Sequence, residues 1–489
     1  EDGALFLLRR ANIIALDAPL ENASAVDRAK AREIVEAVDG LPLALDQAGA
    51  YIEETGCGLA GYLSRYQTQR GQLLKRRGGL VEDHREPVAT TWKLSFQKVE
   101  QANPAAADLL RLCAFLASDA IPEEIIMEGA SDLSPALQSI ASNPVELDTA
   151  IEELRKYSLV RRDPDAQTLT IHRLVQAVLK EEMDKETQRQ WAECAVRAVN
   201  DAFPEVKYET WPQCRRLLPH AQVCAELIKQ WDVAFLEAGQ LLGGVGRYLR
   251  ERAQYREAEL YYKGALTIYE KAQGPDDHDV AVSLNNLALL YKIEGRHAEA
   301  ELLYQKSLAI KEKILEPQDP SLATGFSNLA VLYTDQGKYV EAESLARRAL
   351  AIREKVLGPE HIDVAVSLSV LAYLYEQQGK YAEAEPLVQR ALTINENTLG
   401  LEHPSTVNSL HHLAFLYSQQ SKYTQAESLY QSVLAFFERT LGSEHPDVAL
   451  ALENYAALLR ETNREDEASK LYARARAIRV KHAQENRMD

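Results

Sequence analysis

The feature that most constrains the fold is a repeat of 42 residues in the second half of the chain. A large residue recurs at Leu249, Tyr291, Tyr333, Tyr375, Tyr417 and Leu459, and an alanine at Ala258, Ala300, Ala342, Ala384, Ala426 and Ala468. A fixed period of this size is typical of solenoids, in which neighbouring units bury each other's apolar faces. The spacing therefore predicts an α-solenoid of about six helix pairs.

Each repeat reads as two helices separated by a short break. The breaks contain Gly295, Gly337, Gly379, Ser421 and Asn463, residue types that tolerate the end of a helix. Ser or Asp recurs where the first helix of each pair is expected to begin, at Asp279, Ser321, Asp363, Ser405 and Asp447. We expect these side chains to accept hydrogen bonds from free amides of the first turn.

Histidines between the repeats, at His361, His403 and His445, raise the possibility of a metal site. A spacing of 42 residues places them on successive loops of a stack, about one repeat apart. We therefore expect local loop hydrogen bonding and no metal site.

The string Leu287–Tyr291 (LALLY) and its later copies, followed by Gly-Lys-Tyr and Glu-Ala-Glu, resemble tetratricopeptide repeats. The long period and linkers such as Gly358-Pro359-Glu360-His361 resemble the kinesin light chain type, over about residues 241–483. The resemblance implies that the first helix of each pair lines a concave groove for a protein or peptide ligand.

The resemblance also selects candidate groove residues. Asparagine is a poor helix-interior residue that offers both a donor and an acceptor to a peptide backbone, although such residues can also simply decorate a solvated helix. The candidates are Asn285, Asn286, Leu289, Lys292, Asn328, Val331, Tyr373, His412, Phe415 and Asn454.

The first 240 residues lack the period and carry other motifs. Gly40-Leu41-Pro42-Leu43-Ala44 joins two expected helices, at about 26–38 and 43–54. The string resembles the GLPLA motif of NB-ARC domains, the nucleotide switches within the STAND class of signalling ATPases. The resemblance implies that Pro42 packs beside the adenine of a bound nucleotide.

A β-hairpin is expected from about Leu159 to Ile171, after helices at about 104–117, 122–128 and 145–157. This order suggests a winged helix. Ile171-His172-Arg173 resembles the Met-His-Asp motif of NB-ARC proteins, which implies that His172 contacts the β-phosphate of ADP. Arg173 replaces the acid of that motif, and His172 could alternatively cap or pack at a strand-to-helix junction.

These patterns predict a mainly all-α protein of four parts. They are an ARC-like helical subdomain (1–86), a winged helix (87–183), a helical linker (184–240) and the solenoid (241–489). The first residue is not Met and lies within an expected helix, so we expect a fragment of a longer protein.

The sequence lacks a GxxxxGK[ST] phosphate loop and any paired catalytic residues with supporting spacing. We therefore expect neither enzyme activity nor a cofactor in this chain alone, whereas the full-length protein would bind ADP or ATP with Mg²⁺. The five cysteines show no CxxC pair, and neither a signal peptide nor a long apolar run is evident. These features favour a soluble, cytoplasmic protein.

The net charge of −18 disfavours nucleic acid as a partner. Our first hypothesis is the sensor and regulatory half of a STAND ATPase. Its solenoid would bind a protein or peptide, its front half would gate upstream nucleotide-binding and effector domains, and it could oligomerise on activation. The alternative is a tetratricopeptide scaffold or transcriptional regulator with no nucleotide role.

Overall fold

The computed structural model describes residues 1–15, 17–38, 40, 42–74, 88–129 and 134–485. This part of the chain is mainly helical with one small antiparallel sheet, which confirms the expected fold class. It divides into two compact units. The front unit comprises residues 1–204 and 215–233, and the repeat unit comprises 205–214 and 234–489. The expected division into four parts stays a prediction.

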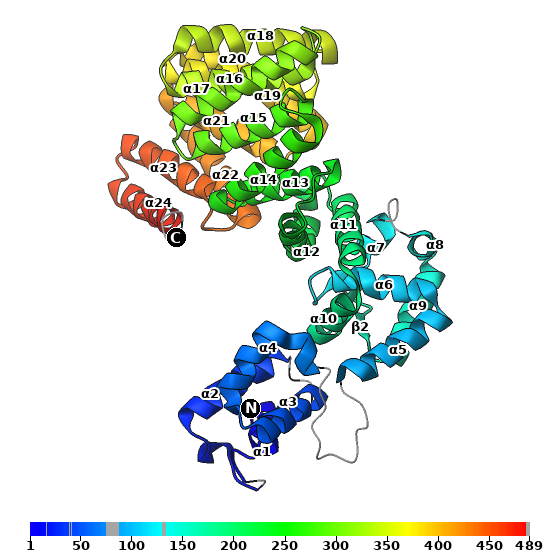
Figure 1. Ribbon diagram of the computed structural model, residues 1–489. Helices are drawn as coiled ribbons and strands as arrows, with labels where there is room; N and C mark the ends of the chain where they lie inside the picture. Colours follow the sequence, from blue (N-terminus) through cyan, green and yellow to red (C-terminus); the bar gives the residue numbers. More distant parts are fainter. Residues whose placement is uncertain (16, 39, 41, 75–87, 130–133, 486–489) are drawn as a thin grey trace. The chain divides into compact units, whose positions relative to one another are not determined.

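The front unit begins with four helices around one apolar core (Figure 1). They are α1 (Asp2–Arg10), α2 (Ala25–Ala37), α3 (Pro42–Thr55) and α4 (Gly58–Leu74), with a short 3-10 helix, η1 (Leu20–Asn22), before α2. Ser24 caps α2 by accepting from the Asp27 amide. Gly40 has φ +68°, a left-handed conformation that suits the junction before α3.

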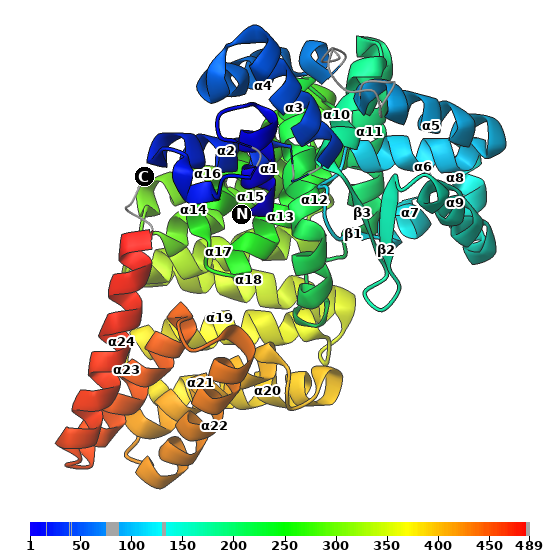
Figure 2. The same ribbon diagram turned by 90° about the horizontal axis from the view of Figure 1, so that it is seen from below.

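The rest of the front unit combines helices with the sheet. The elements are α5 (Val88–Ala102), α6 (Pro104–Ala114), β1 (Ile121–Pro122), α7 (Glu124–Glu128), α8 (Pro135–Ser142), α9 (Pro144–Lys156), β2 (Val160–Asp163), β3 (Thr168–Ile171), α10 (Arg173–Glu182), α11 (Lys185–Ala202) and most of α12 (Trp211–Gln230). The strands lie in the order β1-β3-β2, beside α7 and α9 (Figure 2).

The expected hairpin is present, with Val160 opposite Ile171 and Asp163 opposite Thr168. The helix expected over 122–128 starts later, at Glu124, because Ile121 and Pro122 pair with β3 as a third strand. Helix α8, which the sequence did not lead us to expect, begins after Ser134, whose hydroxyl caps it.

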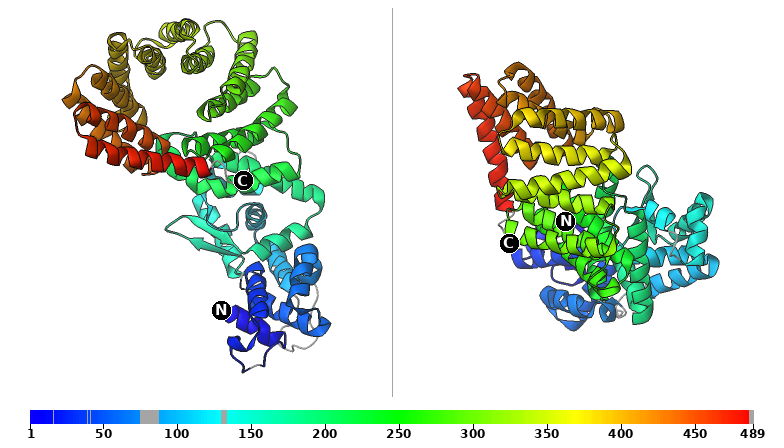
Figure 3. Two further views of the ribbon diagram at one scale, coloured as in Figure 1. Left: turned by 90° about the vertical axis from the view of Figure 1, so that its left-hand side faces the viewer. Right: turned by 90° about the horizontal axis from the view of Figure 1, so that it is seen from above.

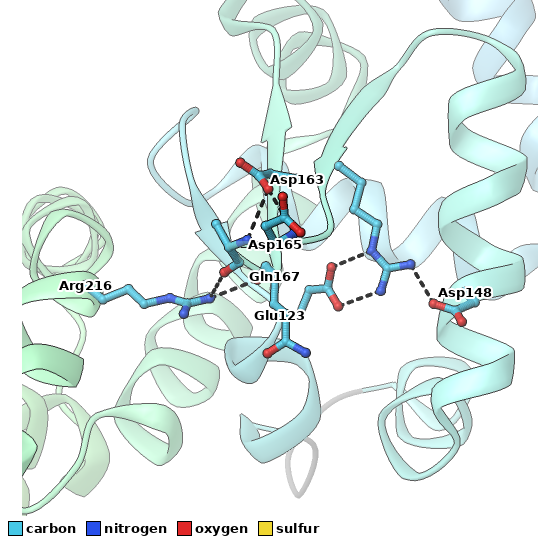
Figure 4. A network of polar contacts seen from close by, with 8 residues as sticks. Glu123, Asp148, Asp163, Asp165, Gln167 and Arg216 are labelled. Carbon is cyan, nitrogen blue, oxygen red and sulfur yellow. Dashed lines mark hydrogen bonds and ion pairs between the residues drawn. The ribbon is translucent and has the colours of Figure 1, made fainter.

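A polar network holds the hairpin in place (Figure 4). Arg162 makes a bidentate ion pair with the buried Glu123, at 2.7 and 2.8 Å, and a third contact with Asp148 at 2.6 Å. Arg216 of α12 donates to the carbonyls of Ala166 and Gln167 in the turn, at 2.7 and 2.9 Å. Arg162 and Arg216 therefore both make these contacts within the front unit.

The repeat unit contains six antiparallel helix pairs stacked in sequence order (Figures 1 and 2). The pairs are α13 (Leu236–Glu251) with α14 (Tyr255–Gln273), α15 (His278–Ile293) with α16 (His297–Ile314), α17 (Pro320–Asp335) with α18 (Tyr339–Leu357), α19 (Ile362–Gln377) with α20 (Tyr381–Leu399), α21 (Pro404–Gln419) with α22 (Tyr423–Leu441), and α23 (Pro446–Glu461) with α24 (Glu465–Glu485). A 3-10 helix, η3 (Tyr208–Thr210), also belongs to this unit.

The repeated alanines explain the close packing of each pair. All six, from Ala258 to Ala468, are fully buried, so a larger side chain there would push the paired helices apart. The expected breaks are also present, since Gly295, Ser421 and Asn463 have φ of +77°, +61° and +60° at helix ends.

The expected caps of the first helices are wrong by two residues. The capping residues are Asp277, Asp319, His361, His403 and His445. The residues expected to cap, from Asp279 to Asp447, lie inside the first turn and donate their backbone N–H to these caps. Proline at the first helical position of three of the helices moves the start forward, because its missing N–H costs nothing there. The loop histidines thus make the expected local hydrogen bonds.

Candidate ligand groove of the repeat unit

The period of 42 residues places equivalent side chains of the first helices in rows along one face. In one row, Leu289, Val331, Tyr373 and Phe415 are each half-buried, whereas the next residue of each helix is fully buried in the core. These four side chains therefore face out of the helix-packing core. The same row begins one repeat earlier, at Arg247 of α13, which the sequence analysis missed although the register identifies it.

The candidate asparagines connect successive repeats. Asn328 donates through Nδ2 to Oδ1 of the buried Asn285 at 3.0 Å. Asn454 Nδ2 lies 3.1 Å from His411 Nε2. Asn286 is half-buried at the position equivalent to Asn328. The structure thus brings most of these amides into contacts between neighbouring repeats, along the same face as the apolar row.

A second row, one turn further along the helices, consists of polar and charged residues. It contains Arg250, Lys292, Thr334, Glu376, Ser418 and Arg460, each 42 residues from the next. Lys292 Nζ lies 3.8 Å from Asp335, and Tyr373 donates to the other oxygen of that carboxylate at 2.7 Å. Burial lowers the pKa of Lys292 in spite of the opposing charge of Asp335. The predicted groove residues Lys292 and Tyr373 thus meet at one carboxylate.

His412 makes a further polar contact on this face. Its Nδ1 lies 3.2 Å from both oxygens of Glu376, a carboxylate with only 4% of its side chain exposed. Burial opposes protonation of His412, but the hydrogen bond and charge of Glu376 hold its pKa above the ordinary value. The adjacent His411 behaves oppositely, because burial and the neighbouring His412 lower its pKa to about 4.

A cavity of about 540 Å³ lies within the repeat unit, at the first-repeat end of these rows. Arg247, Arg250 and Ile293 line one side, and Asn408 and Phe436 of the fifth pair line another. His445 Nε2 lies 3.3 Å from the carbonyl of Glu251 and also links the first and sixth pairs. The pairs therefore curve around this cavity, here called the inner channel, and Arg247 and Arg250 of the two rows line it. Figure 3 shows the curved stack of helix pairs.

A short segment from outside the repeats completes this cavity. Residues 205–211, here called the strap, contribute Val206, Tyr208 and Trp211 to its lining. No motif in the sequence indicated this segment, since it lies outside the period.

The two nucleotide-motif residues lie in the front unit. His172 caps α10 by accepting at Nδ1 from the Leu174 amide at 3.1 Å, the geometry of the capping alternative. Pro42 begins α3, but its side chain and Leu41 lie outside the described residues. A nucleotide role for either residue stays a prediction.

Two absences hold for the described part of the chain. No cluster of three or more His, Cys, Asp or Glu residues there is placed to hold a metal ion. None of the helices in those ranges is long and apolar enough to cross a membrane.

Comparison with known proteins agrees with the repeat architecture. Residues 237–313, 321–397, 368–438 and 405–479 match the tetratricopeptide repeat family. Residues 97–188 match a domain of unknown function, DUF7779. The chain therefore carries tetratricopeptide repeats in its second half.

One curated relative matches about half of the chain. The chain is 31% identical over 265 residues to a nucleotide-binding leucine-rich repeat (NLR)-like protein of Hyaloscypha variabilis, covering 52% of this chain and 26% of that protein. The chain thus spans about a quarter of the length of the curated relative it matches.

Two solved structures are similar to parts of the chain. A kinesin light chain with nearly identical TPR-like repeats from Podosopora anserina is 32% identical and matches 42% of this chain and 97% of its own, with a TM-score of 0.34. A STAND protein with a tetratricopeptide repeat sensor from Pyrococcus horikoshii is 14% identical and matches 91% and 74%, with a TM-score of 0.38.

Proposed function

We infer that the chain is the sensor and regulatory part of a STAND-type signalling protein. Its repeat unit binds a segment of a protein or peptide along the inner rows. Its front unit gates a nucleotide-binding domain that belongs to a longer form of the protein. The kinship with an NLR-like protein supports this assignment.

The observation that carries the binding role is the apolar row from Leu289 to Phe415. Its side chains are turned away from the helix core and flanked by polar groups that can pair with a peptide backbone. Apolar pockets beside a few fixed polar groups are typical of surfaces that bind extended segments.

The alternative role as a transcriptional regulator receives less support from the front unit. A winged helix would read DNA with a basic hairpin, but Arg162 is paired with Glu123 and Asp148. The hairpin turn is also tied to Arg216. Unpaired basic side chains supply most of the affinity for DNA phosphates, and the hairpin therefore offers fewer of them.

The binding role is tested with a partner recovered by pull-down and two groove variants. Asn328→Ala and Phe415→Ala should each weaken its binding by about 1–3 kcal/mol. The control is Val340→Ala, a residue 82% exposed on α18, a second helix of a pair. Normal binding by both folded groove variants would show that the ligand does not use these rows.

The nucleotide role of His172 is tested in a longer form that contains the nucleotide-binding domain. His172→Ala should accelerate ADP release, and so should His172→Asn, which keeps a capping side chain but lacks the imidazole. Rescue of ADP retention by Asn would assign His172 to helix capping alone. The chain without that domain should show no tight ADP binding by calorimetry, because the sequence lacks a phosphate loop.

A further inference from the structure

The strap is held in the repeat unit by its two aromatic side chains. The Tyr208 ring lies 6.4 Å from the ring of Phe436 on α22 and 5.6 Å from that of Trp211. Trp211 Nε1 donates to Glu251 of α13 at 3.3 Å, and its ring also faces the Arg252 guanidinium at 5.4 Å. The strap therefore connects the first pair to the fifth across the channel.

The strap occupies the space between the first and fifth pairs, here called the seat, without filling it. A 3.6 Å contact between His403 and the exposed Glu209 also links the strap to the fifth pair. A cavity of about 540 Å³ remains beside Tyr208 and Trp211, which is large enough for several side chains. A segment that filled this volume would bury more apolar surface than the strap does.

The seat is continuous with the groove rows. Arg247 and Arg250, the first-repeat members of the two rows, line the same cavity as Tyr208 and Trp211. A ligand that followed the rows to their first-repeat end would therefore meet the strap and compete with it.

From this geometry we propose that the strap is an internal occupant of the ligand channel. The partner is a peptide segment that forms one helical turn and carries two aromatic side chains three residues apart, as in Tyr208 and Trp211. It takes the seat of those rings and displaces the strap. This inference rests on the proposed binding role of the inner rows and names the chemistry of the partner.

Displacement of the strap would affect the front unit through the covalent chain. The strap ends at Trp211, which is also the first residue of α12. Five residues later in the same helix, Arg216 donates hydrogen bonds to the carbonyls of the hairpin turn. Release of Trp211 thus frees the first turn of the helix that holds the hairpin.

The probe is a fluorescein-labelled synthetic peptide with the sequence of residues 204–213, and the protein is the full chain. In the wild-type chain the tethered strap competes at an effective concentration on the order of millimolar, so the peptide should bind weakly. The double variant Tyr208→Ala/Trp211→Ala empties the seat and should bind the peptide at least tenfold more tightly. The matched control is Glu205→Ala, an exposed strap position, which should behave as wild type.

A peptide in which both aromatic residues are alanine should not bind the double variant. Equal affinity of the labelled peptide for wild type and the folded double variant would overturn the proposal, and so would equal binding of the alanine peptide. If the double variant does not fold, Tyr208→Ala alone applies the same test. If this test fails while Phe415→Ala still weakens partner binding, the proposed binding role of the rows stands. Only the displacement of the strap is then refuted.

Discussion

At the scale of single residues, buried ionisable groups determine where the protein is sensitive to pH. His220 of α12 is 1% exposed, and its Nε2 lies 3.2 Å from the carbonyl of Ala120, to which it donates as the neutral imidazole. Burial lowers the pKa of His220 to about 4, and the bond to Ala120 opposes this only in part.

Because the folded pKa lies below the ordinary value, His220 contributes stability above about pH 6.5 that is lost as the pH falls toward 4. Between pH 7.5 and pH 5 this loss should be about 2 kcal/mol. In urea titrations, His220→Gln, which keeps a donor but does not titrate, should lose correspondingly less stability. An identical pH dependence in both proteins would show that His220 is not the titrating group.

A second residue, Arg353, is a buried cation held by hydroxyl groups. Its side chain is 4% exposed and donates to Ser367, Thr324 and Ser327 at 2.8, 3.0 and 3.4 Å. Burial lowers its pKa, although the charge of Asp363 opposes this. The next repeat has the neutral Asn395 at the same position, bonded to Ser409, the equivalent of Ser367.

Since an unpaired buried charge is costly, the neutral side chain of the next repeat should be tolerated here. Arg353→Asn should change the free energy of unfolding by less than about 1 kcal/mol, whereas Arg353→Glu should cost about 3 kcal/mol or more. Thermal and urea unfolding would check both. A loss for Asn as large as that for Glu would mean that the positive charge itself is required.

At the scale of elements, the tight contact within each helix pair depends on the repeated alanine. Ala342 of α18 is 0% exposed, so Ala342→Leu should overpack the pair and lower the free energy of unfolding by about 1–3 kcal/mol. Val340→Leu on the same helix, at an exposed position, is the control and should be neutral. Equal melting temperatures for the two variants would contradict this role of the alanine.

The repeat helices could be predicted because one period governs both packing and breaks, so every copy supports the others. Their caps were misplaced because Asp or Ser also recurs two residues later, inside the first turn, and because in three helices the capping acceptor is an imidazole Nδ1, as in His361 and His445. The period identified the row from Leu289 onward, whose role as a groove stays a prediction, yet Arg247 was missed because the first copy departs from the motif.

The strap lay beyond prediction for a different reason. Its contacts join Tyr208 to Phe436 and Trp211 to Glu251, residues far apart in the sequence. They exist only because the stacked pairs curve around a channel, a property of the accumulated packing angles. The short strand β1 was missed similarly, since its two residues become a strand only by pairing with β3.

At the scale of the whole molecule, the chain passes between its two units three times, at residues 204–205, 214–215 and 233–234. The strap is therefore joined covalently to the front unit at residue 204 and, through residues 212–214, at residue 215. A ligand can shift a switch only if it binds one state better than the other. Competition with the strap would supply that difference in the proposed sensor.

Our central proposal is that the state of the repeat unit controls nucleotide retention in a longer form of the protein. The most direct test is the release rate of fluorescently labelled ADP from that longer form, compared between wild type, Tyr208→Ala/Trp211→Ala and the control Glu205→Ala. We predict that the double variant releases ADP at least several-fold faster, while the control matches wild type. Equal release rates from all three folded proteins would contradict the claim.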